Sequence, residues 1–414
     1  MPRVLITTST LPRHQTDPEP RFVLDLTRHL PPDWEPLILA PAYPGARPEE
    51  LLDGVPVRRY HYAPLARWET LCYPGSILAR VQQQPGLIGL VPGLLTGLWR
   101  AVANELNSRL YDCVHAHWFF PQGAVHALGF STHRHPPLVL TSHGGDLGLT
   151  QRWPLLRSQL GRILRRAAAI TVVAPGMKDM LAASGYPIDI QAVRVIPMGA
   201  DLKCFRPELR DPGWPRRHGL LPPVILSVGR LVEKKGFGIM IEAFSHLVTD
   251  GQQPTLAICG EGPLADTLKR QAQVLGLADR VYFLGALPHP ELAIAYASSD
   301  IYCAPSIAAG DGDMEGMPTV LAEAAASGLP LIGSRIAGIP LIIEHERTGL
   351  LVPSGDVVAL VAAMQRLVND AELRYRLGAL AFTKAQDFAW PRIAEDYAEV
   401  YAEACFSHKQ QLTA

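Results

Sequence analysis

Short runs of β-branched residues alternate with longer helical patterns along nearly the whole chain of 414 residues. This alternation is typical of α/β proteins, in which helices connect parallel strands and cover the sheet. The expected strands are RVLITTS, EPLILAP, CVHAHW, PLVLTSH, AAITVVA and VRVIPM in the first half, and PVILSVGR, TLAICGE, RVYFLGA, DIYCAPS and LPLIGS in the second. The sequence therefore predicts parallel sheets of the doubly wound type.

The length of the chain exceeds what one hydrophobic core usually covers, so two domains are expected. Segment 204–223, CFRPELRDPGWPRRHGLLPP, lies between the two sets of strands and is predicted to be a linker because it is polar and rich in proline. In doubly wound folds a ligand binds at the carboxyl ends of the strands. We therefore expect a ligand cleft between the two domains.

The formal net charge is -1, and 19% of the residues are charged. This composition argues against a nucleic-acid-binding protein. The six cysteines are dispersed, without a CxxC pair or a metal-ligand spacing, which favours free thiols in a reducing compartment. The apolar run at the N-terminus is too short for a signal peptide. We expect a cytoplasmic protein.

The most apolar stretch is GLIGLVPGLLTGLW, residues 86–99. It is too short to span a bilayer and is interrupted by Pro92 and glycines, so no transmembrane helix is expected. An interfacial segment stays open as an alternative. A basic helix further along is compatible either with contact to anionic lipid or with a solvated face of a core helix; its arginines are Arg157, Arg162, Arg165 and Arg166. We expect at most transient contact with an anionic membrane.

Two cations follow the expected strand PVILSVGR. In SVGRLVEKKGF, Arg230 and Lys235 fall in the loop after this strand. A planar guanidinium and a flexible ammonium can converge on one anion above the strand ends, a combination suited to phosphate oxygens. The alternative is that both are solvated loop cations.

A glycine motif follows the next strand. LAICGEGPLADTL contains Gly260, Gly262 and Ala265, a G-x-G-x-x-A pattern between a strand and a helix. The first strand-to-helix turn of the chain, TTSTLPRHQTD, contains no glycine, which disfavours an oxidoreductase built on a first-strand fingerprint. We expect Gly260 and Gly262 to let the backbone approach part of a ligand.

The stretch DGDMEGMPTVLAEAAASG, residues 311–328, is typical of a helix N-terminus that binds an anion. Pro318 fits the first helical position and Gly328 fits the end of the helix. The amides of Thr319 and Val320 have no partner within the helix, so they and the helix dipole can bind a diphosphate.

Two glutamates flank this N-terminus. Glu323 lies one turn inside the helix among alanines, on a face too buried for an idle charge, and a ribose diol could donate hydrogen bonds to it. Glu315 precedes the helix and would accept from sugar hydroxyls. A nucleotide sugar satisfies both. Asp311 and Asp313 resemble a metal-binding DxD pair, but we interpret them as an ordinary acidic loop.

Histidines end two strands in the first half of the chain. In TSHGGDLG, His143 and Asp146 combine polar side chains with a flexible glycine backbone, as a reacting centre requires. His115 and His117 end the strand CVHAHW. A structural role is the commoner one for a strand-end histidine, and the expected cleft favours a functional role for His143.

Together these motifs resemble the retaining glycosyltransferases of family 4. The matching residues are HGGD at His143, then Gly229, Arg230, Lys235 and Gly236, then GEGP from Gly260 to Pro263, and E-x7-E from Glu315 to Glu323. The resemblance covers nearly the whole chain and implies an α/β GT-B fold, with two Rossmann-like doubly wound domains facing across a cleft. It places the acceptor on residues 1–205 and the sugar nucleotide on 206–387, with the last helix, 388–414, completing the first domain.

The resemblance also implies roles for individual residues. Arg230 and Lys235 would hold the diphosphate and stabilise the leaving group, and with His143 and Glu315 they are the expected catalytic residues. Glu323 would bind the ribose. The other donor-binding residues would be Gly229, Gly260, Gly262, Leu284, Gly285, Leu287, Gly316, Met317, Pro318, Thr319 and Val320, and His117 and Asp146 would face the acceptor. No metal or other cofactor is implied, because the cations and the helix N-terminus neutralise the diphosphate.

Two positions depart from the family pattern. The first loop, residues 11–22, reads LPRHQTDPEPRF, with Pro20 where family members usually carry paired glycines. Leu341 stands where many relatives carry glutamate. The first departure removes the glycines through which the loop would contact phosphate. The second removes a side chain that would contact the donor.

The sequence therefore predicts a retaining hexosyltransferase. It would move a hexose or hexosamine from a nucleoside diphosphate sugar, in particular a UDP-sugar, to a hydroxyl of a glycan or lipid-linked acceptor in polysaccharide biosynthesis. We expect it in the cytoplasm, peripheral on the inner face of the membrane. Two alternatives stay open: a GT-B sugar-nucleotide epimerase and a non-catalytic sugar-nucleotide-binding subunit. The E-x7-E pair favours transfer, and the joint presence of His143, Arg230, Lys235 and Glu315 favours an enzyme.

Overall fold

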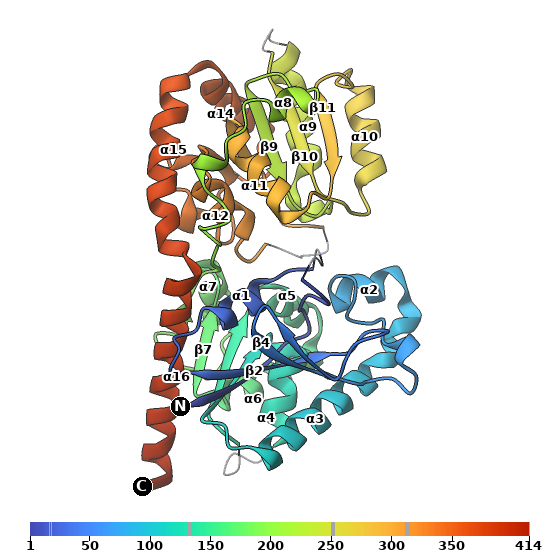
Figure 1. Ribbon diagram of the computed structural model, residues 1–414, viewed down its shortest axis with the longest axis vertical. Coiled ribbons are helices and arrows are strands. Elements are labelled where there is room, and N and C mark those ends of the chain that lie inside the picture. The colour runs from blue at the N-terminus through green and yellow to red at the C-terminus, as the bar shows by residue number, and fades with distance from the viewer. Residues whose placement is uncertain (16, 18, 131–134, 250–252, 311–314, 414) are drawn as a thin grey trace. The chain divides into compact units, whose positions relative to one another are not determined.

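The computed structural model consists of two α/β units, each built around its own sheet (Figure 1). The structure describes residues 1–15, 17, 19–130, 135–249, 253–310 and 315–413. Unit 1 comprises Met1–Ile196 and Trp390–Ala414, and unit 2 comprises Pro197–Ala389. The boundary expected between residues 205 and 206 therefore lies inside unit 2.

The proline-rich segment 204–223 is folded and belongs to unit 2. It contains η5 (Pro207–Leu209) and α8 (Trp214–Arg217), and it buries Phe205 and Trp214. The ring of Phe205 packs edge-on against Tyr296 at 5.5 Å between centroids. The prediction of a linker is wrong here because two large aromatic side chains bring the segment into a core in spite of its prolines.

Unit 1 contains an eight-stranded sheet with the order β3-β4-β2-β1-β5-β6-β7-β8. Its strands are β1 (Arg3–Thr7), β2 (Glu35–Pro41), β3 (Glu49–Leu52), β4 (Val55–Tyr60), β5 (Cys113–His117), β6 (Leu138–Ser142), β7 (Ala169–Val172) and β8 (Arg194–Val195). Every pairing is parallel except that of β3 with β4. The strand order reverses between β1 and β5, where doubly wound sheets bind their ligands.

The helices of unit 1 lie mostly between consecutive strands, as the alternating pattern predicted. They are α1 (Phe22–Arg28), α2 (Ile77–Gln83), α3 (Val91–Ser108), α4 (Ala124–Gly129), α5 (Gly145–Arg152), α6 (Pro154–Arg165), α7 (Pro175–Ala183) and α16 (Trp390–Thr413).

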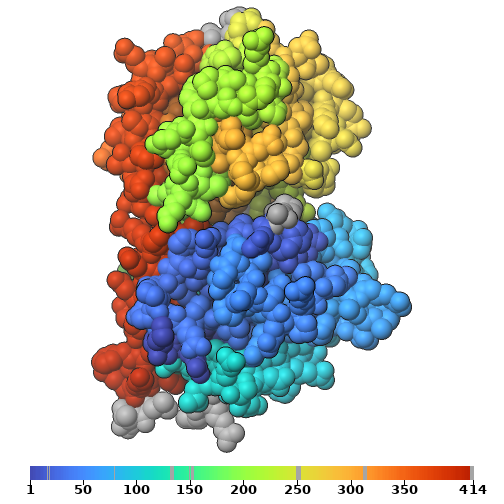
Figure 2. All heavy atoms as spheres, in the orientation of Figure 1, coloured from blue at the N-terminus to red at the C-terminus, as the bar shows by residue number. Residues whose placement is uncertain are grey.

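The last helix, α16, packs on unit 1, and Figures 1 and 2 show it as the red helix along that unit. The hydroxyl of Tyr401 lies 2.7 Å from Nδ1 of His115 in β5. Tyr397 and Tyr401 are both buried, and Trp34 packs edge-on against Tyr401 at 5.2 Å. Aromatic side chains and one buried hydrogen bond thus attach residues 390–413 to the sheet of unit 1.

Unit 2 contains a six-stranded parallel sheet with the order β11-β10-β9-β12-β13-β14. Its strands are β9 (Val224–Val228), β10 (Thr255–Cys259), β11 (Val281–Gly285), β12 (Ile301–Ala304), β13 (Leu331–Ser334) and β14 (Gly349–Val352). Its longer helices are α9 (Phe237–Thr249), α10 (Ala265–Val274), α11 (His289–Ser298), α12 (Thr319–Ala326), α14 (Val357–Asn369) and α15 (Ala371–Ala385), and α13 (Ile339–Ile342) is a single turn. The order reverses between β9 and β12, so the loops after these two strands form the predicted ligand-binding edge.

The apolar segment at residues 86–99 is helical throughout. The 3-10 helix η2 (Pro85–Leu90) runs directly into α3, and Pro92 lies in the first turn of α3, where proline removes no helical hydrogen bond. Within the described part of the chain, this 24-residue stretch contains an 18-residue window with a mean hydropathy of 1.5, which makes it long and apolar enough to cross a membrane, and 17% of that window is buried. The expectation that the segment is too short is therefore wrong. Core helices of soluble proteins meet the same criteria, so the segment alone does not identify a membrane protein.

Candidate functional site

The loop after β9 carries Lys235 to the reversal point of the unit 2 sheet. Lys235 ends the short 3-10 turn η6 (Glu233–Lys235), and Gly236 follows it with a left-handed φ of 70°. A Cβ at Gly236 would lie 1.9 Å from the carbonyl oxygen of Pro305, directly after β12. Only glycine fits at this position, and the close approach holds the β9 loop against the end of β12.

Lys235 forms an ion pair with Glu315, with 2.6 Å between Nζ and Oε2. The two side chains are only 16% and 12% exposed. Burial by itself would raise the pKa of Glu315, but the charges of Lys235 and Lys234 hold it below its ordinary value. The site therefore contains a desolvated, ionised pair at neutral pH.

The backbone between Glu315 and α12 is fixed by neighbouring loops of unit 2. The amide of Gly338 donates to the carbonyl of Gly316 at 2.8 Å, and a Cβ at Gly338 would lie 2.8 Å from the same oxygen. The Sδ of Met317 accepts from the amide of Met198 at 3.0 Å, and Met317 is buried. These contacts set the direction in which Glu315 leaves the backbone.

Helix α12 begins at Thr319, one residue later than predicted, because Pro318 has an extended ψ of 109° and occupies the N-cap. Pro318 is buried and the side chains of Thr319 and Val320 are half-buried. The first amides of a helix have no acceptor within it, so this end of α12 presents donors and the positive end of the helix dipole. Binding of an anion at this end of α12 stays a prediction.

Glu323 is held by a residue that the sequence analysis did not identify. The phenol of Tyr296, on α11, donates to Oε2 of Glu323 at 3.0 Å. Tyr296 is fully buried, and burial together with the nearby carboxylate raises its pKa well above the usual value. The phenol stays protonated and fixes the orientation of Glu323.

Gly260 and Gly262 serve a close approach between two loops of unit 2. A Cβ at Gly260 would lie 2.0 Å from the carbonyl oxygen of Gly229, and a Cβ at Gly262 would lie 2.5 Å from that of Leu231. The amide of Leu231 donates to the carbonyl of Glu261 at 2.9 Å. The glycines thus let the β10 loop pack on the β9 loop, so the motif has a structural reason that does not require a ligand.

The remaining donor-side candidates also lie at the carboxyl edge of the unit 2 sheet. Arg230 is exposed directly after β9, next to Gly229. Leu284 and Gly285 end β11, and Leu287 follows them half-buried. Their contacts with a nucleotide stay predictions.

In unit 1, His143 and His117 form a pair of imidazoles at the carboxyl ends of β6 and β5. Nδ1 of His117 lies 2.9 Å from Nε2 of His143, and the rings are 18° from parallel. Burial lowers the pKa of His143 to about 3, and burial and neighbouring imidazoles hold that of His117 well below its usual value. Both rings are neutral at physiological pH.

The contact between the two rings determines which nitrogen of His143 carries its hydrogen. Nε2 of His117 is buried and has no hydrogen-bond partner among the described atoms. Buried N–H groups without an acceptor are rare, so the favoured tautomer has its hydrogen on Nδ1 of His117, which donates to His143. His143 then carries its own hydrogen on Nδ1 and can donate it to a substrate oxygen.

Asp146 is buried and its carboxylate is occupied within unit 1. Its oxygens accept from the amide of Phe119 at 2.6 Å, from the amide of Leu147 at 3.1 Å and from the hydroxyl of Ser142. Burial raises the pKa of Asp146, and these hydrogen bonds oppose the shift only in part. Asp146 therefore organises the ends of β5 and β6, and His115 is likewise held in the core, by Tyr401 and Thr141.

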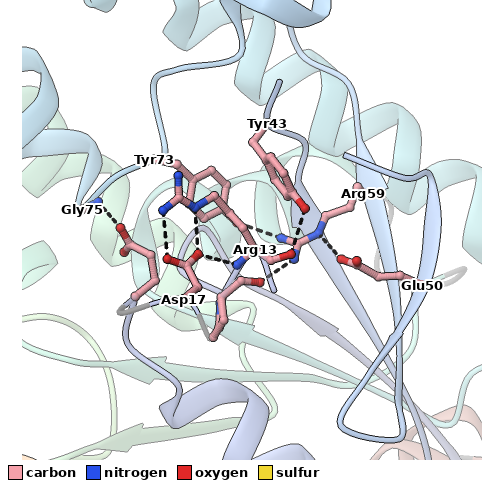
Figure 3. A network of polar contacts seen from close by, with 9 residues as sticks. Arg13, Asp17, Tyr43, Glu50, Arg59, Tyr73 and Gly75 are labelled. Atoms are coloured by element: carbon pink, nitrogen blue, oxygen red, sulfur yellow. Dashed lines mark hydrogen bonds and ion pairs between the residues drawn. The ribbon is translucent and has the colours of Figure 1, made fainter. Parts of the chain in front are cut away.

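The first loop is fixed by side chains, as Figure 3 shows. The guanidinium of Arg59, in β4, is buried and donates to the carbonyl of Pro12 at 2.6 Å, to the hydroxyl of Tyr73 at 2.9 Å and to Glu50 at 2.8 Å. The loop therefore gains its conformation from a buried cation on a neighbouring strand rather than from glycine.

Two further contacts close this loop. The backbone amide and the Nε of Arg13 each donate to Oδ2 of Asp17 at 2.7 Å, and the hydroxyl of Tyr43 donates to the carbonyl of Arg13 at 2.8 Å. These bonds hold the loop against the strands that follow it.

Among the described residues there is no group of three or more histidine, cysteine, aspartate or glutamate side chains that could hold a metal ion. Asp311 and Asp313 lie outside the described residues.

The sequence also matches two known family descriptions. Residues 20–203 match "Glycosyltransferase Family 4", and residues 215–383 match "Glycosyl transferases group 1". The chain thus contains a glycosyltransferase family 4 domain followed by a glycosyl transferases group 1 domain. The family 4 match covers most of unit 1 and extends to residue 203, and the group 1 match lies within unit 2.

Several known glycosyltransferases are similar to this chain. It is 36% identical over 230 residues to the amylovoran biosynthesis glycosyltransferase AmsK of Erwinia amylovora, covering 55% of this chain and 54% of that protein. It is 32% identical over 244 residues to a GDP-mannose-dependent alpha-(1-6)-phosphatidylinositol monomannoside mannosyltransferase of Mycolicibacterium smegmatis, covering 58% and 63%. It is 31% identical over 231 residues to the putative colanic acid biosynthesis glycosyltransferase WcaL of Escherichia coli, covering 55% of each. The match thus spans a little over half of the length of these relatives.

Solved structures show the fold. Sucrose-phosphate synthase from Thermosynechococcus elongatus superimposes with a TM-score of 0.77 at 22% identity, over 97% of this chain and 99% of that one. The HepE protein of Anabaena, in complex with UDP and glucose, superimposes with a TM-score of 0.70 at 19% identity, over 97% and 100%. The predicted GT-B fold, with two Rossmann-like α/β domains, is confirmed.

The structure brings some of the predicted site residues together. Lys235 contacts Glu315, and His143 contacts His117. Tyr296 and Arg59 were missed. Tyr296 is one polar-tipped aromatic in an apolar helix, and Arg59 is one of two adjacent arginines in a strand, so neither carried a local signal of its partner.

Proposed function

We propose that this protein is a retaining glycosyltransferase that moves a hexose or hexosamine from a nucleoside diphosphate sugar to a hydroxyl acceptor without a metal ion. The observation that carries the proposal is the desolvated Lys235–Glu315 pair at the reversal point of the unit 2 sheet. A buried cation near the N-terminus of α12, where the first amides can donate hydrogen bonds, suits a diphosphate leaving group. A buried carboxylate suits sugar hydroxyls.

In this proposal each described group has a defined task. Lys235, Arg230 and the first amides of α12 stabilise the negative charge that develops on the diphosphate as the glycosidic bond breaks. Glu323, oriented by Tyr296, accepts from the ribose hydroxyls, and Glu315 accepts from the sugar. His143 donates from Nδ1 to a sugar oxygen. These tasks require no proton transfer by a group that titrates near neutral pH.

We propose a UDP-sugar as the donor. Structures of HepE contain UDP, and that protein shares the fold at 19% identity. Relatives named for GDP-mannose dependence, at 32% identity, make GDP-mannose the second candidate. A thermal-shift screen with UDP-, GDP- and ADP-sugars decides between them, because only a ligand of the folded state raises the melting temperature. A shift with GDP-mannose alone would overturn the proposed base.

We propose a glycan or lipid-linked intermediate of polysaccharide biosynthesis as the acceptor. The relatives AmsK and WcaL are named for exopolysaccharide biosynthesis. Incubation with radiolabelled donor and lipid-linked extracts, followed by separation of the lipid phase, tests this. The configuration of the new linkage, read by NMR coupling constants, tests retention, and turnover in excess EDTA tests metal independence.

We also propose a cytoplasmic protein that contacts the inner face of the membrane transiently. The segment from η2 to α3 exposes apolar side chains, including Ile88 at 63% and Trp99 at 45%. Co-sedimentation with liposomes containing anionic lipid at low salt should detect binding, and replacement of Ile88 and Trp99 by serine should weaken it. Absence of binding at low salt would overturn this part.

The Lys235–Glu315 pair is the direct test of the proposed chemistry. Lys235→Ala and Glu315→Ala should each lower slow donor hydrolysis by at least about a hundredfold, since removing one electrostatic stabiliser costs that much in kcat. The exposed pair of Arg366 and Glu346 gives a matched control, in which Arg366→Ala should leave hydrolysis unchanged. Full turnover in both site variants would overturn the assignment.

Two other functions remain to be separated by product analysis. A sugar-nucleotide epimerase would release an altered sugar without an acceptor, and a binding subunit would release no sugar. A transferase releases nucleoside diphosphate in amounts that rise when acceptor is added.

A further inference from the structure

Unit 1 contains a cavity that is lined by none of the candidate site residues described above. It has a volume of about 300 Å³ and lies at the amino ends of β6 and β7. Its lining includes the aromatic rings of His126, Phe130 and His135 and the cationic or polar side chains of Arg165, Arg166 and His408. His143 lies at the opposite end of β6, about 16 Å away at 3.3 Å per residue. The cavity is therefore separate from the proposed reaction site.

The two histidine rings that line the cavity are held in place because all of their nitrogen atoms are hydrogen-bonded. His135 and His126 are both buried. Nδ1 of His135 lies 2.7 Å from the carbonyl of Pro136, its Nε2 lies 3.0 Å from Nδ1 of His126, and Nε2 of His126 lies 3.1 Å from the hydroxyl of Thr7. Since a carbonyl only accepts, each histidine donates from Nδ1 and the chain of bonds runs in one direction. Both rings are therefore fixed in position, and their nitrogen atoms are already engaged and do not bind a ligand.

Cationic side chains line the cavity together with His135: they are Arg165 and Arg166, with His408 beside them in the lining. Burial lowers the pKa of His135, the hydrogen bond to the carbonyl of Pro136 opposes this shift, and Arg166 and His408 add to it. No aspartate or glutamate occurs among the described residues that line the cavity. The end of α6 contributes roughly half a negative charge, which is less than the two positive charges of Arg165 and Arg166. An excess of cationic groups beside a cavity is typical of an anion site.

We propose that this cavity binds a phosphate ester, with the phosphate between the guanidinium groups of Arg165 and Arg166 and the organic part against Phe130 and His135. Planar guanidinium groups bind phosphate oxygens in pairs, and His408 and Ser407 add donors from α16. The volume exceeds the needs of inorganic phosphate, which leaves room for the organic part. The same chemistry is found in soluble phosphate monoesters and in lipid headgroups.

The test uses the imidazole signal of His408 in the NMR spectrum of the full chain, assigned through its loss in His408→Gln. Titration with glycerol 3-phosphate should shift this signal with saturation, and titration with glycerol should leave it unchanged. Vesicles of phosphatidylcholine with phosphatidic acid form the second arm, with phosphatidylcholine alone as control. Saturable binding of glycerol 3-phosphate supports a soluble ligand, and a response to phosphatidic acid vesicles alone supports a headgroup.

Matched variants separate the cavity from general surface charge. Arg165→Gln with Arg166→Gln should weaken binding about tenfold or more, whereas Arg162→Gln, on the same helix but outside the cavity, should change it less than about twofold. Lys235→Met, at the proposed donor site, should leave the His408 response intact. No response to any phosphate probe, or equal losses in the Arg162 variant and the double variant, would overturn the proposal.

Discussion

Replacement of Lys235 by methionine tests whether burial of the Lys235–Glu315 pair determines its effect on the stability of unit 2. The side chains are 16% and 12% exposed and 2.6 Å apart. Removing one partner of a buried pair costs about 3–5 kcal/mol, because the other charge is left uncompensated. Lys234 still attracts Glu315, so we expect the lower end, about 3 kcal/mol.

A second ion pair in the chain, with the same distance between its charged atoms, provides a control. Arg366 and Glu346 are also 2.6 Å apart, but their side chains are 49% and 44% exposed. Arg366→Met should cost less than about 1 kcal/mol because water screens the pair. The double variant Lys235→Met with Glu315→Gln should recover most of the loss, since no buried charge remains.

Hydrogen exchange under increasing urea, read by mass spectrometry on peptides from β9 and β10, measures unit 2 without assuming that both units unfold together. The pH dependence gives a second check. With Lys235 present, the lowered pKa of Glu315 means that its contribution is present above about pH 4.5 and is lost as the pH falls. Without Lys235, burial would raise that pKa, so the cost should be smaller at pH 5 than at pH 7. Equal costs for the Lys235 and Arg366 variants would refute the reasoning.

Three other predictions concern single residues. Tyr296→Phe should weaken donor binding by roughly three- to tenfold in calorimetry, because Glu323 loses the donor that orients it; unchanged affinity would contradict this role. Arg59→Met should lower the free energy of unfolding of unit 1 by about 3–5 kcal/mol, read by tryptophan fluorescence in urea, whereas Arg3→Met, in an exposed pair, should leave it nearly unchanged; equal effects would be inconsistent with a buried Arg59. The pKa of about 3 for His143 predicts no histidine titration in donor turnover around pH 6.5; a turnover step near pH 6.5 that His143→Gln removes would contradict it. Between about pH 6.5 and 5.5 this one residue should lower the stability of unit 1 by about 1 kcal/mol, because only the unfolded chain takes up its proton, and the other buried histidines add to the total, so the measurement is the difference between the parent protein and His143→Gln.

The strand and helix pattern was sufficient to predict two doubly wound sheets, because parallel strands buried on both faces are continuous apolar runs. It missed the antiparallel pair of β3 and β4, whose sequences are short and mixed. Asp53 and Gly54 form the turn between them with φ angles of 49° and 84°, a recognised hairpin signal that was not used. Strand β14, four buried residues after a loop, was also missed.

The motifs located the loops at the carboxyl edge of the unit 2 sheet but not the contacts within them. The contact of Lys235 with Glu315 depends on the approach of Gly236 to Pro305, and the contact of Tyr296 with Glu323 joins two helices. Such contacts depend on how loops and helices pack, and local sequence does not specify this. The hydrogen bonds of Asp146 to the amide of Phe119 and the hydroxyl of Ser142 could not be predicted for the same reason, and its contact with an acceptor stays a prediction.

The position of α16 has a consequence for how the protein is made. Residues 390–413 complete the core of unit 1, and Tyr401 contacts His115 nearly three hundred residues earlier in the chain. Domains usually fold in order as they leave the ribosome. Here unit 2 is complete first, and the first domain to be synthesised must wait, with the α16 face of its sheet uncovered, until the ribosome has added the final helix.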